Sequence, residues 1–163
     1  MVEILDVVDE NDNVIGKVTR EEVHKNKLIH RSVMFFILDK DGRVFVSQRT
    51  KEKDMFPEYW SITLGGHVNS GETYEETVVR EAWEEAKIKE KPFLITSLKK
   101  RIPEEKENSM IYGFVTDQKQ KLEKKELKQG KFMTLKEIEK KIKEEKFLPE
   151  TDFLLKVIKN YRK

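Results

Sequence analysis

The chain has 163 residues, a length that favours one domain covering residues 1–163, and 39% of its residues are charged. Its 33 Lys and Arg residues nearly balance its 31 Asp and Glu residues, and the net charge of +2 gives no sign of a specific nucleic-acid-binding surface. Without cysteine there is no disulfide, thiolate zinc site or cysteine nucleophile, and without an apolar leader or an 18-residue apolar run we expect a cytoplasmic protein that does not enter a membrane.

The first 64 residues predict five strands and one short helix, because apolar segments alternate with polar turns. Thr19 and Glu22 have the spacing of a capping box, which favours a helix start there. The run from Ser32 to Leu38 is apolar on both alternating faces, so we expect this strand in the centre of a sheet. The expected strands cover residues 2–8, 14–18, 31–38, 43–49 and 61–64, and the helix covers 19–26.

A glycine-rich turn at residues 65–71 leads into the next predicted helix, which runs from Glu72 or Thr73 to Ala86. Thr73 and Glu76 again have capping-box spacing. The apolar stripe expected to face the core consists of Val78, Val79, Ala82 and Ala86.

A second face of the same helix carries three carboxylates, Glu81, Glu84 and Glu85, at positions i, i+3 and i+4. Carboxylates this close together repel one another unless a cation lies among them. Hard cations such as Mg²⁺ prefer oxygen ligands of this kind, often together with substrate phosphates. The residues therefore predict a metal site for a phosphorylated substrate.

The remaining chain predicts three strands and two helices, with charged residues 102–108 as the loop between the first two strands. Gly130 is a possible bulge, and Thr134 with Glu137 forms a third capping-box pattern. The expected strands cover 93–101, 109–116 and 127–133, one helix covers 134–145, and the last helix starts at Pro149 with Phe153, Leu154, Val157 and Tyr161 facing inward. This order predicts an α/β (α+β) fold, a mixed sheet covered by helices on both faces.

The spacing of six residues resembles the Nudix box. The pattern is Gly66, five residues, Glu72, seven residues, Arg80-Glu81, two residues, Glu84-Glu85. Lys87 stands where the box normally has a glycine that ends the helix in a left-handed turn, so Lys87 either prolongs the helix or takes a strained cap. The resemblance implies the Nudix α/β/α sandwich with a mixed β-sheet, and the box helix as its catalytic element.

Four further stretches resemble the Nudix branch related to isopentenyl diphosphate isomerase: His30-Arg31, Gln48-Arg49, Phe56-Pro57-x-x-Trp60 and Gly65-Gly66-His67. Isomerases of that type have a proton-transferring cysteine two positions before the histidine, where this chain has Gly65. They also bind a metal through three histidines and two glutamates. Here the histidines correspond to His24, His30 and His67, while Glu107 matches one glutamate and Ser109 replaces the other.

By resemblance to the box, Mg²⁺ (or Mn²⁺) is held by the Gly65 carbonyl oxygen and by the carboxylates of Glu81, Glu84 and Glu85. Glu72 and Arg80 are expected to pair with each other and fix the turn against the helix. The general base stays open between a box glutamate and a glutamate from a distant loop. The distant candidates, each also interpretable as a surface charge, are Glu104, Glu105, Glu107 and Glu126.

Substrate-binding candidates lie around the box. Arg49 binds phosphate if it faces the site, because a guanidinium forms two parallel hydrogen bonds. His67 either touches a phosphate or the metal, or makes a hydrogen bond behind them. Lys51 and Lys53 belong to the same expected loop as Arg49, and Trp60 either stacks on the substrate or fills the core. Phe56 and His30 are expected in the core, and His24 on the surface of the short helix.

Three functions compete. The first is a pyrophosphohydrolase that cleaves the diphosphate of a nucleoside diphosphate linked to another group, with a phosphorylated small molecule as its partner. The second is an isopentenyl diphosphate isomerase, disfavoured by the absence of cysteine. The third is a non-catalytic nucleotide-binding module, which the complete set of box glutamates does not favour. The apolar surfaces of the N-terminal hairpin and the last helix also allow a homodimer.

Overall fold

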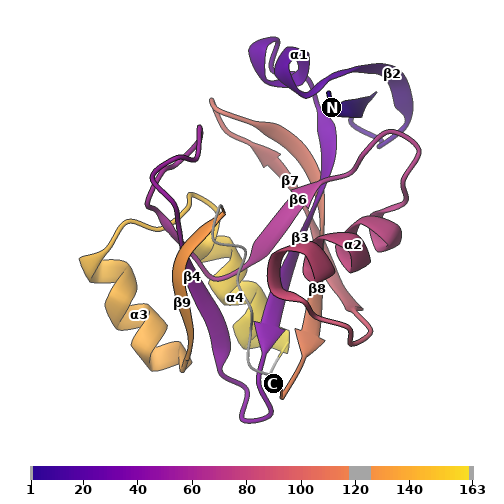
Figure 1. The fold of residues 1–163 in the computed structure, drawn as a ribbon. Helices are drawn as coiled ribbons and strands as arrows, with labels where there is room; N and C mark the ends of the chain where they lie inside the picture. Colours follow the sequence, from indigo (N-terminus) through magenta and orange to yellow (C-terminus); the bar gives the residue numbers. More distant parts are fainter. Residues whose placement is uncertain (1, 118–125, 162–163) are drawn as a thin grey trace.

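The computed structural model describes residues 2–117 and 126–161. Within these residues, nine strands form one mixed sheet that carries four helices (Figure 1). The strands are β1 (Ile4–Val8), β2 (Val14–Thr19), β3 (His30–Leu38), β4 (Val44–Arg49), β5 (Trp60–Ser61), β6 (Leu64–His67), β7 (Phe93–Arg101), β8 (Lys106–Val115) and β9 (Leu127–Met133). The helices are α1 (Arg20–Lys25), α2 (Tyr74–Ala86), α3 (Leu135–Glu144) and α4 (Thr151–Tyr161). None of these described helices is long and apolar enough to cross a membrane.

Strand β3 lies at the centre, buried on both faces as its sequence predicts. On one face Val33, Phe35 and Ile37 pack in a cluster with the apolar side of α2. On the other face the alternate residues of β3 pack in a cluster with α3 and α4 (Figure 1). The predicted α/β/α sandwich with a mixed β-sheet is therefore confirmed.

The pairing of β3 assembles the site from distant parts of the chain. Strand β8 runs parallel to β3 with His30 opposite Glu107, and β6 runs antiparallel to it with Ser32 opposite His67. Two expectations need correction here. The Gly65–His67 segment is a strand rather than part of a turn, and β8 starts at Lys106 rather than at residue 109, because pairing with β3 extends it.

The three predicted capping boxes are all present. The side chains of Thr19, Thr73 and Thr134 each accept a hydrogen bond from the backbone N–H three residues later, and a glutamate closes each box. Each box satisfies backbone N–H groups that the first helical turn leaves without partners. The starts of α1, α2 and α3 were therefore readable from the sequence.

Several details of packing differ from expectation. Val79 is 50% exposed and Tyr161 is 50% exposed, so neither belongs to the core. Helix α4 starts two residues after Pro149 and buries Leu154, Leu155 and Ile158, whereas Phe153, expected to face inward, is 39% exposed. Gly130 pairs regularly with Ser47, and the irregularity of β9 falls opposite Gln48 and Arg49 instead. Gly130 is needed because a Cβ there would lie 2.4 Å from the Phe45 ring.

Lys87 takes the strained alternative at the end of α2. Its φ of 54° and ψ of 36° are left-handed, and its N–H bonds back to the last helical turn. A side chain in this conformation costs about 1–2 kcal/mol that glycine does not incur. The helix therefore ends where a box with glycine would end.

Replacing Lys87 by Gly is expected to raise the free energy of unfolding by about 1 kcal/mol, because it relieves this strain. Lys89→Gly is the matched control: both lysines lie near the Trp83 ring, at 4.9 Å and 5.4 Å, but Lys89 is not among the residues with positive φ. Urea denaturation measures both variants. Equal destabilisation of the two would show that the left-handed cap is not strained.

Candidate functional site

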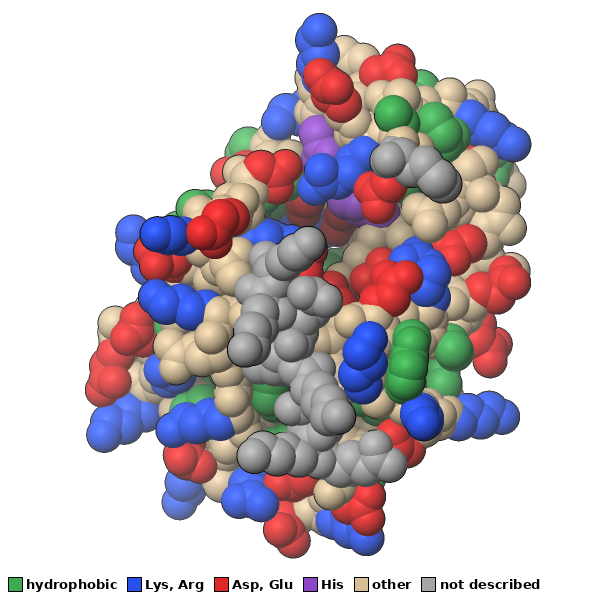
Figure 2. Space-filling view, viewed as in Figure 1, with side chains coloured by type: hydrophobic (Ala, Val, Ile, Leu, Met, Phe, Trp, Pro, Cys, Tyr) green, Lys and Arg blue, Asp and Glu red, His purple; other side chains and the backbone are tan. Residues whose placement is uncertain are grey.

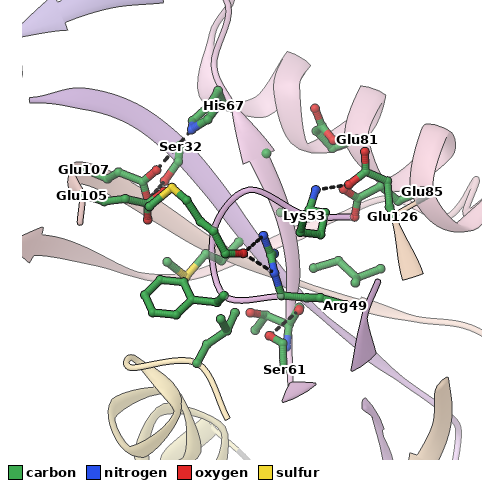
Figure 3. Close-up of a pocket in the computed structure, with 18 of the residues that line it drawn as sticks. Ser32, Arg49, Lys53, Ser61, His67, Glu81, Glu85, Glu105, Glu107 and Glu126 are labelled. Atoms are coloured by element: carbon green, nitrogen blue, oxygen red, sulfur yellow. Dashed lines mark hydrogen bonds and ion pairs between the residues drawn. The ribbon is translucent and has the colours of Figure 1, made fainter. Parts of the chain in front are cut away.

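A cavity of about 870 Å³ opens between α2, the central strands and the loop that follows β4. Figure 2 shows it as a hollow with histidine side chains in its wall. Charged groups line two sides of it, as Figure 3 shows. The α2 side has Glu81, Glu85 and Glu126, and the β8 side has His67, Glu105 and Glu107.

Arg80 holds the α2 side together. Its Nε and Nη2 donate to the two oxygens of Glu72 at 2.8 Å and 2.9 Å, which is the pair expected from the sequence. Its Nη1 donates to Glu81 at 2.8 Å and to Glu84 at 3.2 Å, and Nη2 reaches the His67 carbonyl oxygen at 3.3 Å. One guanidinium thus serves three carboxylates. The hydrogen bond from Arg80 is also the main reason why the pKa of Glu72 is lowered.

Glu81 and Glu85 face the cavity, and burial disfavours the charged form of both carboxyl groups. Burial raises the pKa of Glu81 to about 7, although Arg80 opposes this shift. Burial raises the pKa of Glu85 well above its ordinary value, and the charges of Glu81 and Glu126 raise it further. Glu84 differs, because its side chain is 55% exposed and does not line the cavity. Buried carboxylates of this kind fit a cation, which would favour their charged forms.

The raised pKa of Glu81 gives the metal-free protein a defined pH dependence. The folded carboxyl keeps its proton up to about pH 7, whereas the unfolded one loses it near 4.5. Stability is therefore greatest below the unfolded pKa and falls as the pH rises towards 7, by about 3 kcal/mol for this group. Urea denaturation in EDTA between pH 4.5 and 8 should show this loss in the wild type and less of it in Glu81→Gln. Parallel curves for the two proteins would contradict it.

The two glycines of β6 are required for different reasons. A Cβ on Gly65 would lie 2.3 Å from the Val33 carbonyl oxygen, which is backbone and cannot move away. A Cβ on Gly66 would lie 2.3–2.6 Å from the Glu81 carboxylate, the mobile end of a side chain. Gly65 therefore allows β6 to lie close to the backbone of β3, and Gly66 leaves room for the Glu81 carboxylate.

These contacts predict opposite phenotypes for two alanine substitutions. Gly65→Ala is expected to lower the free energy of unfolding by about 1–3 kcal/mol, as overpacking does. Gly66→Ala should keep most of the stability but displace Glu81, and lower any activity that depends on it by about 10²-fold. Urea denaturation and steady-state kinetics on both variants check this. The same loss of stability in both would refute the distinction.

The β8 side of the cavity brings together all three histidines. The rings of His24, His30 and His67 lie 5.1–5.3 Å apart, and their ligand nitrogens lie within 4.8 Å of one another. Glu105 and Glu107 complete a second such group with His67. This corrects two expectations: His24 is not simply a surface residue, and Glu105 and Glu107 are not surface charges.

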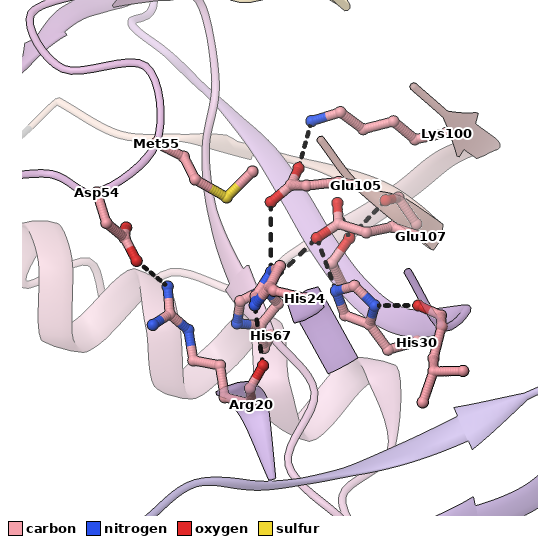
Figure 4. Close-up of polar contacts among 12 residues, drawn as sticks. Arg20, His24, His30, Asp54, Met55, His67, Lys100, Glu105 and Glu107 are labelled. Atoms are coloured by element: carbon pink, nitrogen blue, oxygen red, sulfur yellow. Dashed lines mark hydrogen bonds and ion pairs between the residues drawn. The ribbon is translucent and has the colours of Figure 1, made fainter. Parts of the chain in front are cut away.

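Hydrogen bonds orient two of the rings (Figure 4). The Nδ1 atoms of His24 and His30 lie 3.0 Å from the carbonyl oxygens of Arg20 and Leu28. Because a carbonyl only accepts, Nδ1 carries the proton, and in the neutral ring Nε2 keeps its lone pair. His30 Nε2 is buried, lies 3.2 Å from a Glu107 oxygen and lacks a hydrogen bond of good geometry within the described residues. Nitrogens held this way are typical of metal ligands.

The charge of this group also fits a cation. Lys100 lies 2.8 Å from Glu105 and 3.2 Å from Glu150, and all three side chains are largely buried. Burial lowers the pKa of Lys100, but the surrounding carboxylates outweigh this and raise it, so the lysine stays charged. In the neutral form that metal binding requires, the histidines add no charge, so one lysine faces the carboxylates of Glu105, Glu107 and Glu150. The excess of two negative charges matches a divalent cation.

Glu107 is ionised in this setting. Burial raises the pKa of its carboxyl, but the close approach of the His30 and His67 imidazoles and the charge of Lys100 outweigh that effect and hold the pKa well below its ordinary value. Ser32 Oγ donates to the same carboxylate at 3.1 Å. Sequence reasoning placed Glu107 in a loop. The signal that it missed is the alternation of Glu105 and Glu107, which continues the period of the strand backwards.

The remaining predicted residues lie in different places. Arg49 lines the cavity, but its Nε and Nη2 both donate to the Met55 carbonyl oxygen, at 3.2 Å and 2.9 Å. Trp60 does not line the cavity: it is 7% exposed and stacks on Phe147, which favours its core interpretation. Phe56 does line the cavity and is only partly buried, so its expected place in the core is wrong.

Comparisons with known proteins agree with this architecture. The family model described as NUDIX domain matches residues 28–151. A Streptomyces coelicolor protein named as an uncharacterized Nudix hydrolase is 46% identical over 83 residues, which are 51% of this chain and 46% of the relative. An isopentenyl-diphosphate Delta-isomerase of Photorhabdus laumondii is 29% identical over 144 residues, with 83% and 82% of the two chains covered. The chain spans about half the length of the first curated relatives that it matches.

Solved structures show the same fold. The crystal structure of DR0079 from Deinococcus radiodurans superposes with a TM-score of 0.83 at 24% identity, covering 94% of this chain and 98% of that one. The NUDIX domain of Shewanella oneidensis NrtR, solved in complex with ADP ribose, superposes with a TM-score of 0.66 at 15% identity, covering 90% and 100%. At these identities the likeness concerns the fold.

Proposed function

Because this chain belongs to the Nudix domain family, we propose that it is a pyrophosphohydrolase that uses a divalent metal to cleave a diphosphate bond. The observation that carries the proposal is the α2 side of the cavity. Glu81 and Glu85 face the cavity there, with Glu81 against Gly66, and burial of their carboxyl groups raises both pKa values. Mg²⁺ or Mn²⁺ fits this donor set, since both are hard cations that prefer oxygen ligands.

The metal ligands of the proposal are Glu81, Glu84, Glu85 and the Gly65 carbonyl oxygen. A bound divalent metal lowers the pKa of a coordinated water and neutralises phosphate oxygens. Glu84 Oε2 accepts a hydrogen bond from Arg80 at 3.2 Å, and the side chain would have to turn towards the cavity for a carboxylate oxygen to bind metal. Arg80 and Glu72 act as a brace: they fix the start and middle of α2, so that the carboxylates keep their relative positions.

In the reaction, the oxygen of a water molecule forms a bond to one phosphorus of the diphosphate, and the bridging P–O bond breaks. The water proton goes to a base, and the leaving phosphate takes the bridging oxygen. Glu85 and Glu126 both face this end of the cavity and are the candidates for that base. Lys53 and Arg49 supply the positive charge that a diphosphate requires.

For the substrate we propose a nucleoside diphosphate linked to another group. The cavity volume of about 870 Å³ lies in the range of small-molecule sites. Its wall includes Met55, Phe56 and Leu148, apolar side chains that can pack against the part of the substrate beyond the phosphates. The ADP ribose bound by the related NrtR domain belongs to this chemical class.

A panel of phosphorylated compounds tests the proposal. The protein is incubated with nucleoside diphosphates linked to sugars, alcohols or a second nucleoside, in Mg²⁺, in Mn²⁺ and in EDTA, and the released monophosphates are measured. Cleavage of at least one class in Mg²⁺ or Mn²⁺ and none in EDTA is expected. Cleavage that persists in EDTA would show that the reaction needs no metal.

A second candidate function is an isomerase reaction on isopentenyl diphosphate. It is favoured by the cluster of His24, His30, His67, Glu105 and Glu107 and by the similarity to the Photorhabdus enzyme. It is opposed by Gly65, because a cysteine side chain there would collide with the backbone of β3. We expect no dimethylallyl diphosphate when the protein is incubated with isopentenyl diphosphate, Mg²⁺ and Mn²⁺. Formation of that product would give the cluster a catalytic role.

A further inference from the structure

Lys53 occupies a distinctive place on the α2 side of the cavity. It belongs to the loop between β4 and β5, yet its side chain is only 24% exposed and lines the cavity. Its ammonium forms an ion pair with Glu126, the residue before β9 (Figure 3). Glu126 is its one side-chain partner within the described residues. Lys53 from the loop and Glu126 from a distant part of the chain thus pair on the α2 side of the cavity.

Glu126 lies at the same end of the cavity as Glu81 and Glu85, and its charge acts on Glu85. Its charge and that of Glu81 both oppose ionisation of Glu85, while the charges of Lys53 and Arg49 favour it. Figure 3 shows Glu126 and Lys53 next to Glu85. Because Glu81 already bonds to Arg80, Lys53 and Arg49 are the cations that face Glu85 and Glu126 at the place where a divalent metal is proposed to bind.

Only one of these cations is free to move. The Arg49 guanidinium is fixed by two hydrogen bonds to the Met55 carbonyl oxygen, and these bonds also hold the loop in place. Among the residues that the structure describes, Glu126 alone holds the Lys53 side chain, and its flexible four-carbon stem allows the ammonium to change partners. An ammonium has three donors, so it can bind a phosphate oxygen once a metal satisfies the carboxylates.

We propose that Lys53 is a built-in counter-cation: without metal it neutralises Glu126 and Glu85, and when a divalent metal takes that place it moves to the diphosphate of the substrate. This inference rests on the proposed function. It gives Lys53 two opposite effects, because it competes with the metal for carboxylates and attracts the substrate. An ordinary surface ion pair contributes little to stability and affects neither quantity.

The test measures Mn²⁺ binding and substrate binding separately. Lys53→Met keeps the stem and removes the charge. Electron paramagnetic resonance of free Mn²⁺, without substrate, gives the dissociation constant of the site that Glu85→Gln abolishes. We expect Lys53→Met to lower this dissociation constant by about tenfold, because the substitution removes a charge that competes with Mn²⁺ for the carboxylates. With Mg²⁺ saturating, the KM for the hydrolysed diphosphate should rise by about tenfold.

Two further variants make the test specific. Lys51→Met is the matched control, because Lys51 lies on the same loop but is exposed and does not line the cavity. It should change neither constant. In a Glu126→Gln background, Lys53→Met should no longer tighten Mn²⁺ binding, because the partner through which the lysine is held is neutral.

Unchanged or weaker Mn²⁺ binding in Lys53→Met would overturn the counter-cation role, even if the wild type binds Mn²⁺ and hydrolyses diphosphates. Equal tightening in Lys51→Met would also overturn it, since net charge alone would then explain the effect. If the wild type binds no Mn²⁺ that Glu85→Gln removes, the proposed metal site fails together with this inference. The three results are distinguishable from one another.

Discussion

Replacing Glu85 by Gln is expected to lower kcat/KM for diphosphate hydrolysis by about 10³-fold, because the metal supplies several kcal/mol of transition-state stabilisation and loses a charged ligand. Glu85 lines the cavity one helical turn from Glu81, and the amide has the same shape without the charge. Steady-state kinetics in Mg²⁺ measures the effect. Glu75→Gln is the matched control, since it lies on the same helix but is exposed and does not line this cavity.

The same substitution should act on stability in the opposite direction. Because burial holds the pKa of Glu85 well above its ordinary value, the ionised carboxylate destabilises the metal-free fold at neutral pH. Glu85→Gln is therefore expected to unfold at a higher temperature than the wild type in EDTA. Loss of activity together with loss of stability would indicate a damaged fold. Full activity in Glu85→Gln would contradict a metal site at α2.

Glu107 is the position where substitution should affect the β8 side most. Glu107→Leu removes a buried carboxylate that accepts a hydrogen bond from Ser32 and lies 3.2 Å and 3.4 Å from the Nε2 atoms of His30 and His67. Removing one partner of such a group is expected to lower the free energy of unfolding by about 3–5 kcal/mol. Glu107→Gln keeps an acceptor oxygen and should be destabilised much less, but we expect it to bind divalent cations at the histidines at least about 10²-fold more weakly.

Urea denaturation and Zn²⁺ or Mn²⁺ titration in competition with a chelator check these two variants. Glu104→Gln serves as the control, because Glu104 lies in the same turn and is exposed. Wild-type affinity in Glu107→Gln would show that the cluster of histidines and glutamates is not a metal centre. A stable Glu107→Leu protein would show that the histidines find other partners.

Local chemistry made much of the fold predictable. The three capping boxes at Thr19, Thr73 and Thr134 placed helix starts to within a residue, since each depends only on residues three apart. The apolar run of β3 predicted burial on both faces because the residues that point to either side of the strand are apolar. The pairing of Glu72 with Arg80 followed from the resemblance to the Nudix box and is present as two hydrogen bonds.

What the sequence did not reveal depends on pairing between distant segments. Glu107 sits opposite His30 because β8 extends back along β3, and the alternation of Glu105 and Glu107 is too short a local signal to separate that extension from a charged loop. His24 lies beside His30 and His67 because α1 carries it there, and a helix of six residues has too little periodicity to predict which face is buried. The ion pair between Lys53 and Glu126 joins residues 73 positions apart.

A crystal structure of the protein with Mn²⁺ and a non-hydrolysable nucleoside diphosphate analogue would test the central claim most directly. Anomalous scattering of Mn²⁺ is expected between the carboxylates of Glu81, Glu84 and Glu85 and the Gly65 carbonyl oxygen, with Lys53 on the diphosphate. Mn²⁺ and the diphosphate found together only at the histidine cluster, with no scattering at α2, would contradict a hydrolase site built on the box helix.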